Sequence, residues 1–214
     1  MKNIAIIGEG GHSKVIKDII RAGQQYEVIA IFDDKYERLT DDGMFYGPIL
    51  SVHDLLEKEC FKVVIAIGNN KVRQRIVDVL GLDSKQYATL IHPSAIISES
   101  ATIGNGTVLM PNVVVNADTI IGNHVIINTA AVVEHDNKIS DFVHVSPNAT
   151  LTGSVKVLEG SHVGAGAIII PGITIGDWST IGAGSTIIND IPSFSTAVGS
   201  PARTINKVTQ EVTV

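Results

Sequence analysis

The sequence has little cysteine, few aromatic residues and no long apolar run. Cys60 is the single cysteine among 214 residues, which excludes an internal disulfide framework and a cysteine-based zinc site. No apolar stretch reaches the roughly 18 residues of a membrane helix, and the first residues lack the apolar core of a signal peptide. We therefore expect a cytoplasmic protein that does not insert into a membrane.

Basic residues are also scarce, with 16 lysines and arginines against 22 acidic residues and a net charge of −6. Nucleic-acid binding depends on lysine and arginine side chains that displace counterions from phosphates. An acidic chain without a basic run is a poor candidate for that binding, so no nucleic-acid partner is expected.

A six-residue repeat fills the second half of the chain. Residues 95–190 can be written as 16 hexads without an insertion, and the third position of every hexad is Ile, Leu or Val. A period of six fits neither a helix nor an alternating strand, but it fits a short strand followed by a corner. Three such sides per coil form a triangular solenoid, in which one aliphatic residue per side points inward and residues 18 apart stack.

Glycine recurs at the fourth position of the hexads, at Gly104, Gly122, Gly164, Gly176 and Gly182. We expect these glycines to adopt the unusual φ that a corner requires. The hexads resemble those of the hexapeptide-repeat acyltransferases, and this resemblance implies a left-handed parallel β-helix.

The first 94 residues follow a different pattern, in which apolar strands alternate with amphipathic helices. Strands are predicted over 3–7, 28–32 and 63–67, and helices over 12–22 and around 73–80. This alternation favours a small α/β domain with a Rossmann-like parallel sheet. The predicted organisation is an α/β domain at 1–94, a β-helix at 95–190 and a carboxyl-terminal tail at 191–214.

The turn predicted after the first strand, residues 8–13, reads G-E-G-G-H-S. Glycines between a strand and a helix allow backbone N–H groups to approach a phosphate. Gly10, Gly11 and His12 are therefore candidate nucleotide-binding residues. A tight turn that binds no ligand explains the same glycines.

Two further pairs extend the predicted nucleotide site. Asp33 and Asp34 follow the second strand, where dinucleotide-binding folds place a ribose-binding acid. Gly68 and Asn69 follow the third strand and would lie at the same sheet edge, although Asn69 also suits an ordinary helix cap. The short domain has room for one nucleotide-binding half, so the nucleotide end of a larger ligand fits better than NAD.

His135 lies at a predicted solenoid corner, between Glu134 and Asp136. Such an imidazole is suited to accept a proton near neutral pH, since a carboxylate orients the ring and raises its basicity. An exposed structural histidine would have the same sequence pattern. His144 and His162, 18 residues apart, are predicted to stack on one outer face.

A metal site is an alternative use for these histidines. Some hexapeptide-repeat solenoids resemble the γ-class carbonic anhydrases, which bind metal with histidines shared between subunits. The histidines here offer no convincing set of three ligands within a chain, and that class carries no nucleotide-type domain ahead of its solenoid. No metal is therefore expected.

Several short motifs occur in order between Ile4 and Arg203: G-x-G-G-H, F-D-D, A-I-G-N-N, H-P-S-A, E-H-D, H-V-S and V-G-S-P-A-R. Together they resemble the bacterial nucleotide-sugar acetyltransferases, which include the bacillosamine-pathway N-acetyltransferases and the NeuD-type sialic-acid O-acetyltransferases. The resemblance implies acetyl-CoA as the donor and a nucleotide-activated amino sugar as the acceptor.

The resemblance also implies roles for the solenoid residues. His135 corresponds to the general base and Asp136 to the group that increases its basicity. Family members often carry Glu at the second place, so Glu134 is an alternative partner. His144 matches a histidine that contacts the donor near the thioester, where it or a backbone N–H would stabilise the oxyanion.

Further positions match the binding residues of the family. Ala165 and Ala183 match positions whose backbone lines the pantetheine arm of the donor. Lys156 and Arg203 are candidates for contact with the CoA phosphates. The positions that hold the nucleotide of the acceptor correspond to Gly10, Gly11, His12, Asp33 and Asp34.

Outward-facing positions in the early coils are apolar, namely Ile96, Val108, Val114, Ile120, Ile126 and Val132. A monomer would not leave so much apolar surface in water. Some of these residues are expected under the α/β domain. The others predict a homotrimer with donor sites between adjacent solenoids, which is also the habit of the family that the chain resembles.

The leading hypothesis is an acetyl-CoA-dependent N-acetyltransferase that acts on the 4-amino group of a nucleotide-linked amino sugar for surface-glycan synthesis. The transfer would be direct, with His135 as the base. An O-acetyltransferase acting on a sialic-acid-type hydroxyl is the alternative, and it would use the same base and donor. A non-catalytic nucleotide-sugar-binding trimer is a third hypothesis, which the combination of His135 and His144 disfavours. UDP, dTDP and GDP all remain open as the nucleotide.

Overall fold

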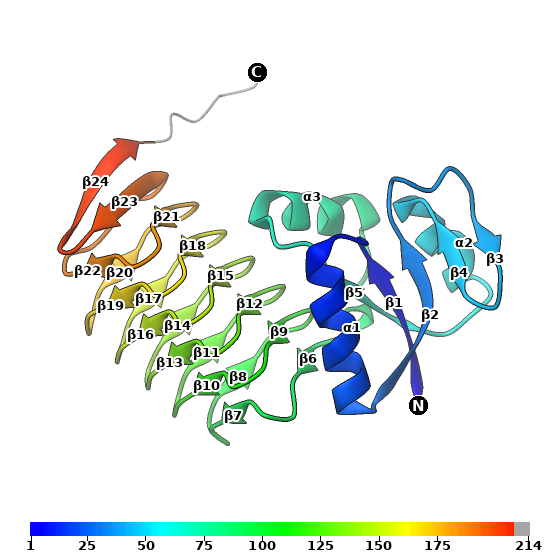
Figure 1. The fold of residues 1–214 in the computed structure, drawn as a ribbon, viewed down its shortest axis with the longest axis horizontal. Coiled ribbons are helices and arrows are strands. Elements are labelled where there is room, and N and C mark those ends of the chain that lie inside the picture. Colours follow the sequence, from blue (N-terminus) through cyan, green and yellow to red (C-terminus); the bar gives the residue numbers. More distant parts are fainter. Residues whose placement is uncertain (208–214) are drawn as a thin grey trace.

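The structure, a computed structural model, describes residues 1–207 and the side chains of residues 1–205. Figure 1 shows an α/β unit beside a solenoid of short strands. The Rossmann-like parallel sheet and the β-helix expected from the sequence are both present. Among the described residues, no helix combines the length and the apolar character needed to cross a bilayer.

The α/β unit contains one five-stranded sheet. Its strands are β1 (Lys2–Ile7), β2 (Tyr26–Phe32), β3 (Thr40–Asp41), β4 (Phe45–Gly47) and β5 (Lys62–Ile65). Its helices are α1 (Gly11–Gly23), α2 (Val52–Leu56) and α3 (Asn70–Leu80), with 3-10 turns at Ile49–Ser51 and Ser84–Gln86. The strand order is β3-β4-β2-β1-β5, and within this sheet the β3–β4 pair is antiparallel while the other described pairs are parallel.

The ends of the long helices follow from local sequence. The Asn69 side chain accepts a hydrogen bond from the amide of Val72 at 3.0 Å and so caps the start of α3. Gly81 ends α3 with a φ of 55°, the left-handed conformation that glycine adopts without a steric penalty. Helix α1 begins directly after Gly10, so its first turn lies in the glycine-rich segment.

The solenoid has three faces, each a parallel sheet apart from the last strand of the first face. The docking face contains β6 (Leu90–Ile91), β9 (Val108–Leu109), β12 (Ile126–Ile127), β15 (His144–Val145), β18 (His162–Val163), β21 (Thr180–Ile181), β23 (Ser195–Gly199) and β24 (Ala202–Lys207). The apolar face contains β7 (Ile96–Ile97), β10 (Val114–Val115), β13 (Val132–Val133), β16 (Thr150–Leu151), β19 (Ile168–Ile169) and β22 (Thr186–Ile187). The lysine face contains β8 (Thr102–Ile103), β11 (Ile120–Ile121), β14 (Lys138–Ile139), β17 (Lys156–Val157) and β20 (Thr174–Ile175).

Strand pairing reproduces the predicted stacking. Lys138 pairs with Lys156 on the lysine face, and His144 pairs with His162 on the docking face. Pairing on the docking face extends beyond the hexads at both ends. It begins at Leu90, and after residue 190 it continues through the hairpin formed by β23 and β24. Residues 208–214 of the predicted tail lie outside the described residues.

The fourth-position glycines serve a different purpose from the one expected. The positive φ angles occur at the sixth position of the hexads, for example at Asp136 (60°) and Gly160 (65°). At the fourth position, a Cβ added to Gly104 would lie 2.5 Å from the carbonyl of Gly122, one coil away. The prediction of unusual φ was therefore wrong at these positions, which require glycine because consecutive coils approach too closely for a side chain.

A continuous apolar core joins the two units. Ile16, Ile19 and Ile20 on α1 belong to the same buried cluster as Val108 and Ile126 on the docking face. Figure 1 shows α1 between the α/β sheet and the first coils of the solenoid. Two of the outward apolar residues that the sequence singled out are thus covered by the α/β unit rather than exposed.

We predict that Gly164→Ala destabilises the solenoid. The new Cβ would lie 2.5 Å from the Ile181 carbonyl oxygen and 2.6 Å from the Ala183 amide nitrogen. The overpacking should lower the free energy of unfolding by about 1–3 kcal/mol, measured by urea denaturation. Gly23→Ala is the matched control, because a Cβ there meets no atom of the described chain within 4 Å. Equal effects of the two changes would contradict this packing argument.

Candidate active site

Arg73 on α3 attaches the α/β unit to the solenoid. Its guanidinium is buried and donates from Nε to the His124 carbonyl and from Nη2 to the Phe142 carbonyl, both at 2.8 Å. It also donates to the Ile67 carbonyl at 3.0 Å and to Asn70 Oδ1 at 2.9 Å. Burial lowers the pKa of Arg73 to about 9, so the group still carries its charge at neutral pH. One cation thus connects backbone oxygens of both units.

A cleft of about 470 Å³ opens where the start of α3 faces the docking face. It brings together the predicted residues Gly68, Asn69 and His144, which are far apart in the sequence. The side chain of Asn70 holds this region together, because it donates to the carbonyls of Gly160 and Ser161 at 3.0 and 3.2 Å. The other residues that line the cleft are Asn70, Lys71, Gly160, His162, Trp178 and Thr180.

His144 and His162 lie parallel in the cleft, with ring centroids 4.9 Å apart. His144 donates from Nδ1 to the Gly68 carbonyl at 3.2 Å and accepts at Nε2 from Asn128 at 3.1 Å. Burial, followed by the charges of His162 and Arg73, lowers the pKa of His144 to about 3. His144 is therefore neutral, and both of its ring nitrogens are already used within the chain.

The glycine turn presents an open surface. A Cβ built on Gly10 or Gly11 would meet no described atom within 4 Å, so a ligand has access to the backbone there. Asp33 at the end of β2 accepts from the amide of Glu9 at 2.7 Å, which ties the turn to the neighbouring strand. Asp34, one residue further, is exposed.

The Glu9 carboxylate in this turn is held by basic side chains. Its oxygens lie 2.8 Å from Lys35 Nζ and 3.4 Å from Lys17 Nζ, and it accepts from the Tyr36 hydroxyl at 2.5 Å. Burial raises the pKa of Glu9, but these contacts outweigh burial and lower it overall. The negative charge of Glu9 is thus largely compensated by Lys35 and Lys17.

His12 is turned inward rather than toward the open turn. Its Nε2 is buried and has no hydrogen-bond partner among the described residues. Burial and the nearby Arg73 charge lower the pKa of His12 to about 4. The Nε2 atom of His12 is thus buried, whereas the neighbouring Gly10 and Gly11 are exposed.

His135 lies at the corner between the apolar and lysine faces and is exposed. Its Nδ1 donates to Asp136 Oδ2 at 2.7 Å, whereas the Glu134 carboxylate accepts from Asn116 at 2.9 Å. The bond to Asp136 raises the pKa of His135, against a smaller effect of desolvation. Of the two acids that the sequence offered as partners, Asp136 is the one that bonds the ring.

The imidazole of His135 occupies the space above Gly153. A Cβ at Gly153 would lie 2.7 Å from Cε1 and 2.8 Å from Nε2 of the ring. Glycine at position 153 thus leaves the room that the His135 ring occupies. Below the corner, Asn137 Nδ2 donates to the Thr152 carbonyl at 2.9 Å, which ties this corner to the next coil.

A single chain does not bring all of the predicted residues together. His135 is at the corner opposite the docking face, while His144 and the glycine turn are on the docking side. Ala165 and Ala183 are exposed at the corner between the docking and apolar faces. Arg203 on β24 pairs with Val198 beside that corner, and Lys156 is exposed on the lysine face. The predicted catalytic and binding residues therefore lie on different sides of the solenoid.

Sequence reasoning missed the residues that organise the cleft. Arg73 is an arginine in an amphipathic helix, and only its complete burial distinguishes it from a surface charge. The repeat register does reveal stacked pairs, such as His135 and Gly153, which stand 18 residues apart at the corner opposite the docking face. Trp178 stands 18 residues after Gly160, another stacked pair that the repeat register contains.

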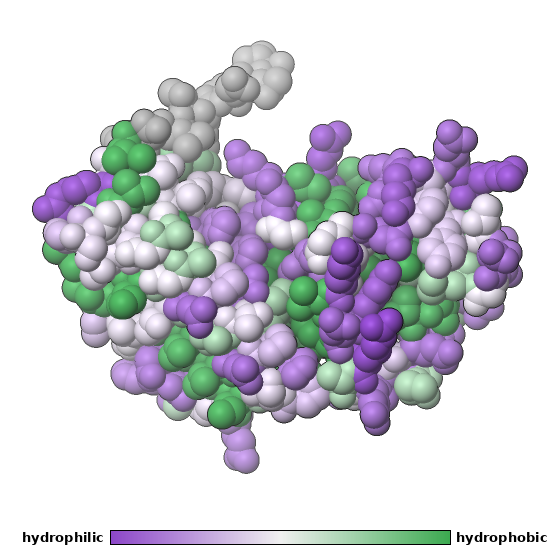
Figure 2. All heavy atoms as spheres, viewed as in Figure 1, coloured by the Kyte–Doolittle hydropathy of each residue, from purple (hydrophilic) through white to green (hydrophobic). Residues whose placement is uncertain are grey.

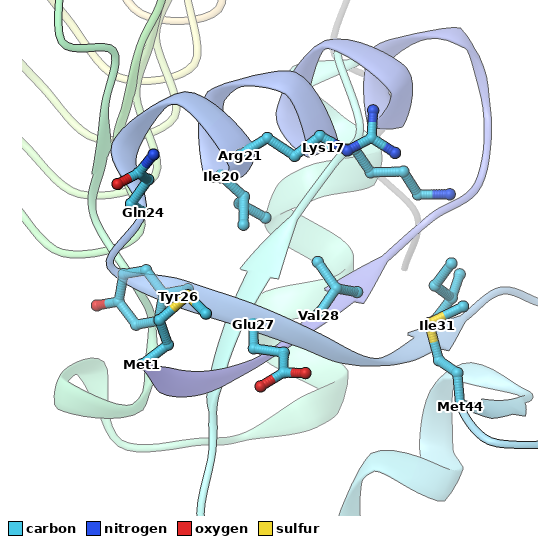
Figure 3. Close-up of a pocket in the computed structure, with 10 residues that line it drawn as sticks. All are labelled: Met1, Lys17, Ile20, Arg21, Gln24, Tyr26, Glu27, Val28, Ile31 and Met44. Atoms are coloured by element: carbon cyan, nitrogen blue, oxygen red, sulfur yellow. The ribbon is translucent and has the colours of Figure 1, made fainter.

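A second cavity, of about 440 Å³, lies between α1 and β2 (Figure 3). Ile20, Tyr26 and Val28 contribute apolar surface to it, and Lys17 and Arg21 come from α1. None of the predicted site residues lines it. Within residues 1–207, no group of three or more histidine, cysteine or acidic side chains is placed to hold a metal ion.

Both units match known protein families. Residues 3–80 match the PglD N-terminal domain, and residues 100–135 and 154–189 match the bacterial transferase hexapeptide repeats. Over 112 residues the chain is 50% identical to UDP-N-acetylbacillosamine N-acetyltransferase of Bacillus subtilis (strain 168). That match spans 50% of this chain and 51% of the relative, about half the length of each.

Solved structures resemble the whole chain. The structure of PerB from Caulobacter crescentus with CoA and GDP-perosamine has a TM-score of 0.88 and 35% identity, covering 96% of this chain and 98% of that one. The acetyltransferase domain of PglB from Neisseria gonorrhoeae FA1090, with acetyl coenzyme A, has a TM-score of 0.85 and 36% identity, covering 95% and 99%.

We predict that acid weakens the docked structure through its buried histidines. Unfolded histidines titrate near pH 6.5, whereas the pKa values of His12 and His144 are about 4 and about 3 in the fold. Between about pH 6.5 and about pH 4 the unfolded chain binds more protons than the folded chain. The stability that these histidines contribute is therefore complete above about pH 6.5 and falls as the pH approaches about 4. Urea midpoints across this range should fall less steeply for His144→Asn. His53→Asn, at an exposed position, is the control, and parallel curves for His144→Asn and the unmodified chain would refute the prediction.

Proposed function

We propose that this chain transfers the acetyl group of acetyl-CoA to the 4-amino group of a nucleotide-linked sugar. The chain belongs to the bacterial hexapeptide-repeat nucleotide-sugar acetyltransferases. The contact between His135 and Asp136 carries this proposal, because it provides an accessible base on a solenoid of the acyltransferase type. The names of the similar proteins support an amine rather than a hydroxyl as the acceptor. Surface-glycan synthesis is the proposed role of the product.

The base in this proposal is Nε2 of His135. Because Nδ1–H is bonded to Asp136, the lone pair for proton transfer is on Nε2. The amine attacks the thioester carbonyl carbon, and a C–N bond forms while His135 accepts the amine proton. The tetrahedral intermediate then releases CoA, the C–S bond breaks, and the proton passes to the departing thiolate. No acyl-enzyme is required.

The donor would be bound along the corner that carries Ala165 and Ala183. Small side chains there leave the backbone accessible to a narrow pantetheine arm. Arg203, which pairs with Val198 in the β23–β24 hairpin, would bind a CoA phosphate beside that corner, while Lys156 would bind one only from the lysine face. Because both nitrogens of His144 are used within the chain, we assign the oxyanion contact to a backbone N–H.

The acceptor would bind at the carboxyl ends of the parallel strands of the α/β unit. Gly10 and Gly11 offer open backbone at a helix start, and Asp34 offers an exposed carboxylate nearby. In this proposal, residues 1–94 bind the nucleotide sugar, residues 95–190 catalyse the transfer, and residues 191–214 complete the binding site of the donor. We expect the reaction in the cytoplasm, consistent with a chain that has a single cysteine.

A homotrimer would join the separated residues. The apolar face exposes Ile96 and Ile168, at 67% and 47%, with Val114 and Val132 partly buried between them. In Figure 2, apolar side chains form patches along the solenoid. If adjacent solenoids pack through this face, the His135 corner of one chain meets the Ala165 corner of the next. The donor site would then lie between subunits, each of which contributes one corner.

Acetylation can be measured by release of the free CoA thiol from acetyl-CoA. We predict turnover with UDP-N-acetylbacillosamine or GDP-perosamine, and a loss of about 100-fold or more in His135→Ala, the usual scale for a lost general base. Size-exclusion chromatography should show the same assembly for both proteins. Retention of most activity by His135→Ala would overturn the base assignment. Turnover with hydroxyl acceptors alone would overturn the proposed amine acceptor.

The assembly is tested by a charge on the apolar face. Ile168→Asp should shift the protein from trimer to monomer in analytical ultracentrifugation, because the new carboxylate would be buried at the contact without a partner. Activity should fall with the trimer. Ile205→Asp is the control, since Ile205 is also an exposed isoleucine, at 57%, but lies on β24. A trimer that persists in Ile168→Asp would exclude this face as the contact.

A further inference from the structure

The corner that carries His135 is held from inside the solenoid by polar side chains that the proposed chemistry does not use. Asn137 is fully buried, although three of the five residues stacked at its position are apolar. The stacked residues are Ala101, Thr119, Asn137, Val155 and Ile173. Thr119 and Asn137 are the two polar members, and both bond the corner that carries the proposed base.

Asn137 joins the two coils between which the imidazole lies. Its Nδ2 donates at 2.5 Å to the carbonyl of Glu134, which precedes His135. The same nitrogen donates at 2.9 Å to the carbonyl of Thr152, which precedes Gly153. The His135 ring lies against Gly153, where a Cβ would be 2.7 Å from Cε1. One amide group therefore sets the spacing between the corner that carries the ring and the backbone on which the ring rests.

The backbone around His135 is bonded to both neighbouring coils. Thr119 Oγ1, in the coil before, donates to the Glu134 carbonyl at 2.8 Å. The Ser154 amide, in the coil after, donates to the His135 carbonyl at 2.9 Å. The peptide groups on the two sides of His135 are thus fixed, and the freedom that remains is that of its exposed side chain.

Asn137 is not the best residue for stability at this position. Its Oδ1 is buried and has no hydrogen-bond partner among the described residues, and a buried acceptor without a partner destabilises a fold. One coil later the same position is occupied by Val155, which is also fully buried and carries no polar side-chain atom. A buried polar group with an unsatisfied atom requires a reason other than folding, and its bonds at the His135 corner supply one.

We propose that Asn137 is a positioning residue for the acetyl transfer, which holds the His135 corner against the next coil so that the imidazole keeps its contact with Asp136. Because Asn137 is buried, it acts through His135 and not on a substrate. This inference rests on the proposed role of His135 as the base. A small displacement of a base slows proton transfer, whereas it need not weaken the binding of either substrate.

Turnover separates positioning from binding. In Asn137→Val, kcat should fall by about threefold to tenfold, the scale of one lost hydrogen bond, while KM for acetyl-CoA and for GDP-perosamine or UDP-N-acetylbacillosamine changes by less than about twofold. Asn137→Thr should recover most of the turnover. A hydroxyl at this position can bond the carbonyl 15 residues later, as the Thr119 hydroxyl bonds that of Glu134.

Thr107→Val is the matched control. Thr107 is equally buried and donates at 2.8 Å to the Gly122 carbonyl, again 15 residues later, but at the corner between the lysine and docking faces. It also accepts from the Val125 amide, so the urea midpoint should fall no further in Asn137→Val than in Thr107→Val. Only Asn137→Val should lose turnover. An equal loss in both variants would indicate a merely structural role and overturn the inference.

The imidazole itself provides a readout that needs no substrate. The bond to Asp136 raises the pKa of His135, and the charge of Glu134 adds a smaller increase. In NMR titrations, the pKa of His135 should be lower in Asn137→Val than in the unmodified chain, because a mobile ring spends less time on Asp136. The same change would move the rise of kcat with pH to lower pH. Thr107→Val should leave the titration unchanged.

The titration separates this inference from the proposed function. An unchanged His135 titration and unchanged turnover in folded Asn137→Val would overturn the inference while the proposed function stands. If no nucleotide amino sugar is acetylated but the pKa of His135 falls in Asn137→Val, the proposed function is overturned and the positioning of the ring is supported.

Discussion

The buried guanidinium of Arg73 determines how the two units are arranged. It donates to the carbonyls of His124 and Phe142 on the solenoid and of Ile67 on the α/β unit, so three backbone segments meet at one cation. A buried charge is tolerated only when its donors are satisfied, and these oxygens fix where α3 can lie. The same contact places the start of α3 against the docking face and so creates the cleft. Its charge also helps to keep His12 and His144 neutral.

The triangular solenoid imposes a second constraint. The α/β unit covers the docking face through Val108 and Ile126 and leaves the opposite corner uncovered within the described part of the chain. His135 is consequently exposed at the opposite corner, which explains why an accessible base and a buried neutral histidine can occur nine residues apart. The proposed function requires that a second chain bring its Ala165 corner to the His135 corner. The apolar face between the two corners is the surface available for such packing.

The local sequence predicted most of the architecture correctly, and the predictions that were wrong have physical causes. The hexad register correctly paired His144 with His162, because every coil has the same length. The fourth-position glycines were correctly located but assigned the wrong reason, since contact between coils cannot be read from one hexad. Asn69 caps α3, as one interpretation of the sequence predicted, and it also lines the wall of the cleft.

The sequence by itself determined the strand period, the inward aliphatic residues, the stacking at 18 residues and the alternation of strands and helices in the first 94 residues. These features depend on neighbours along the chain or on a constant repeat. Tertiary structure alone decided that Asp136 rather than Glu134 bonds His135, that His12 points inward, and that Arg73 is buried. Each of those outcomes depends on which side chains and carbonyls meet across coils or between units, and the register of one element does not specify such meetings.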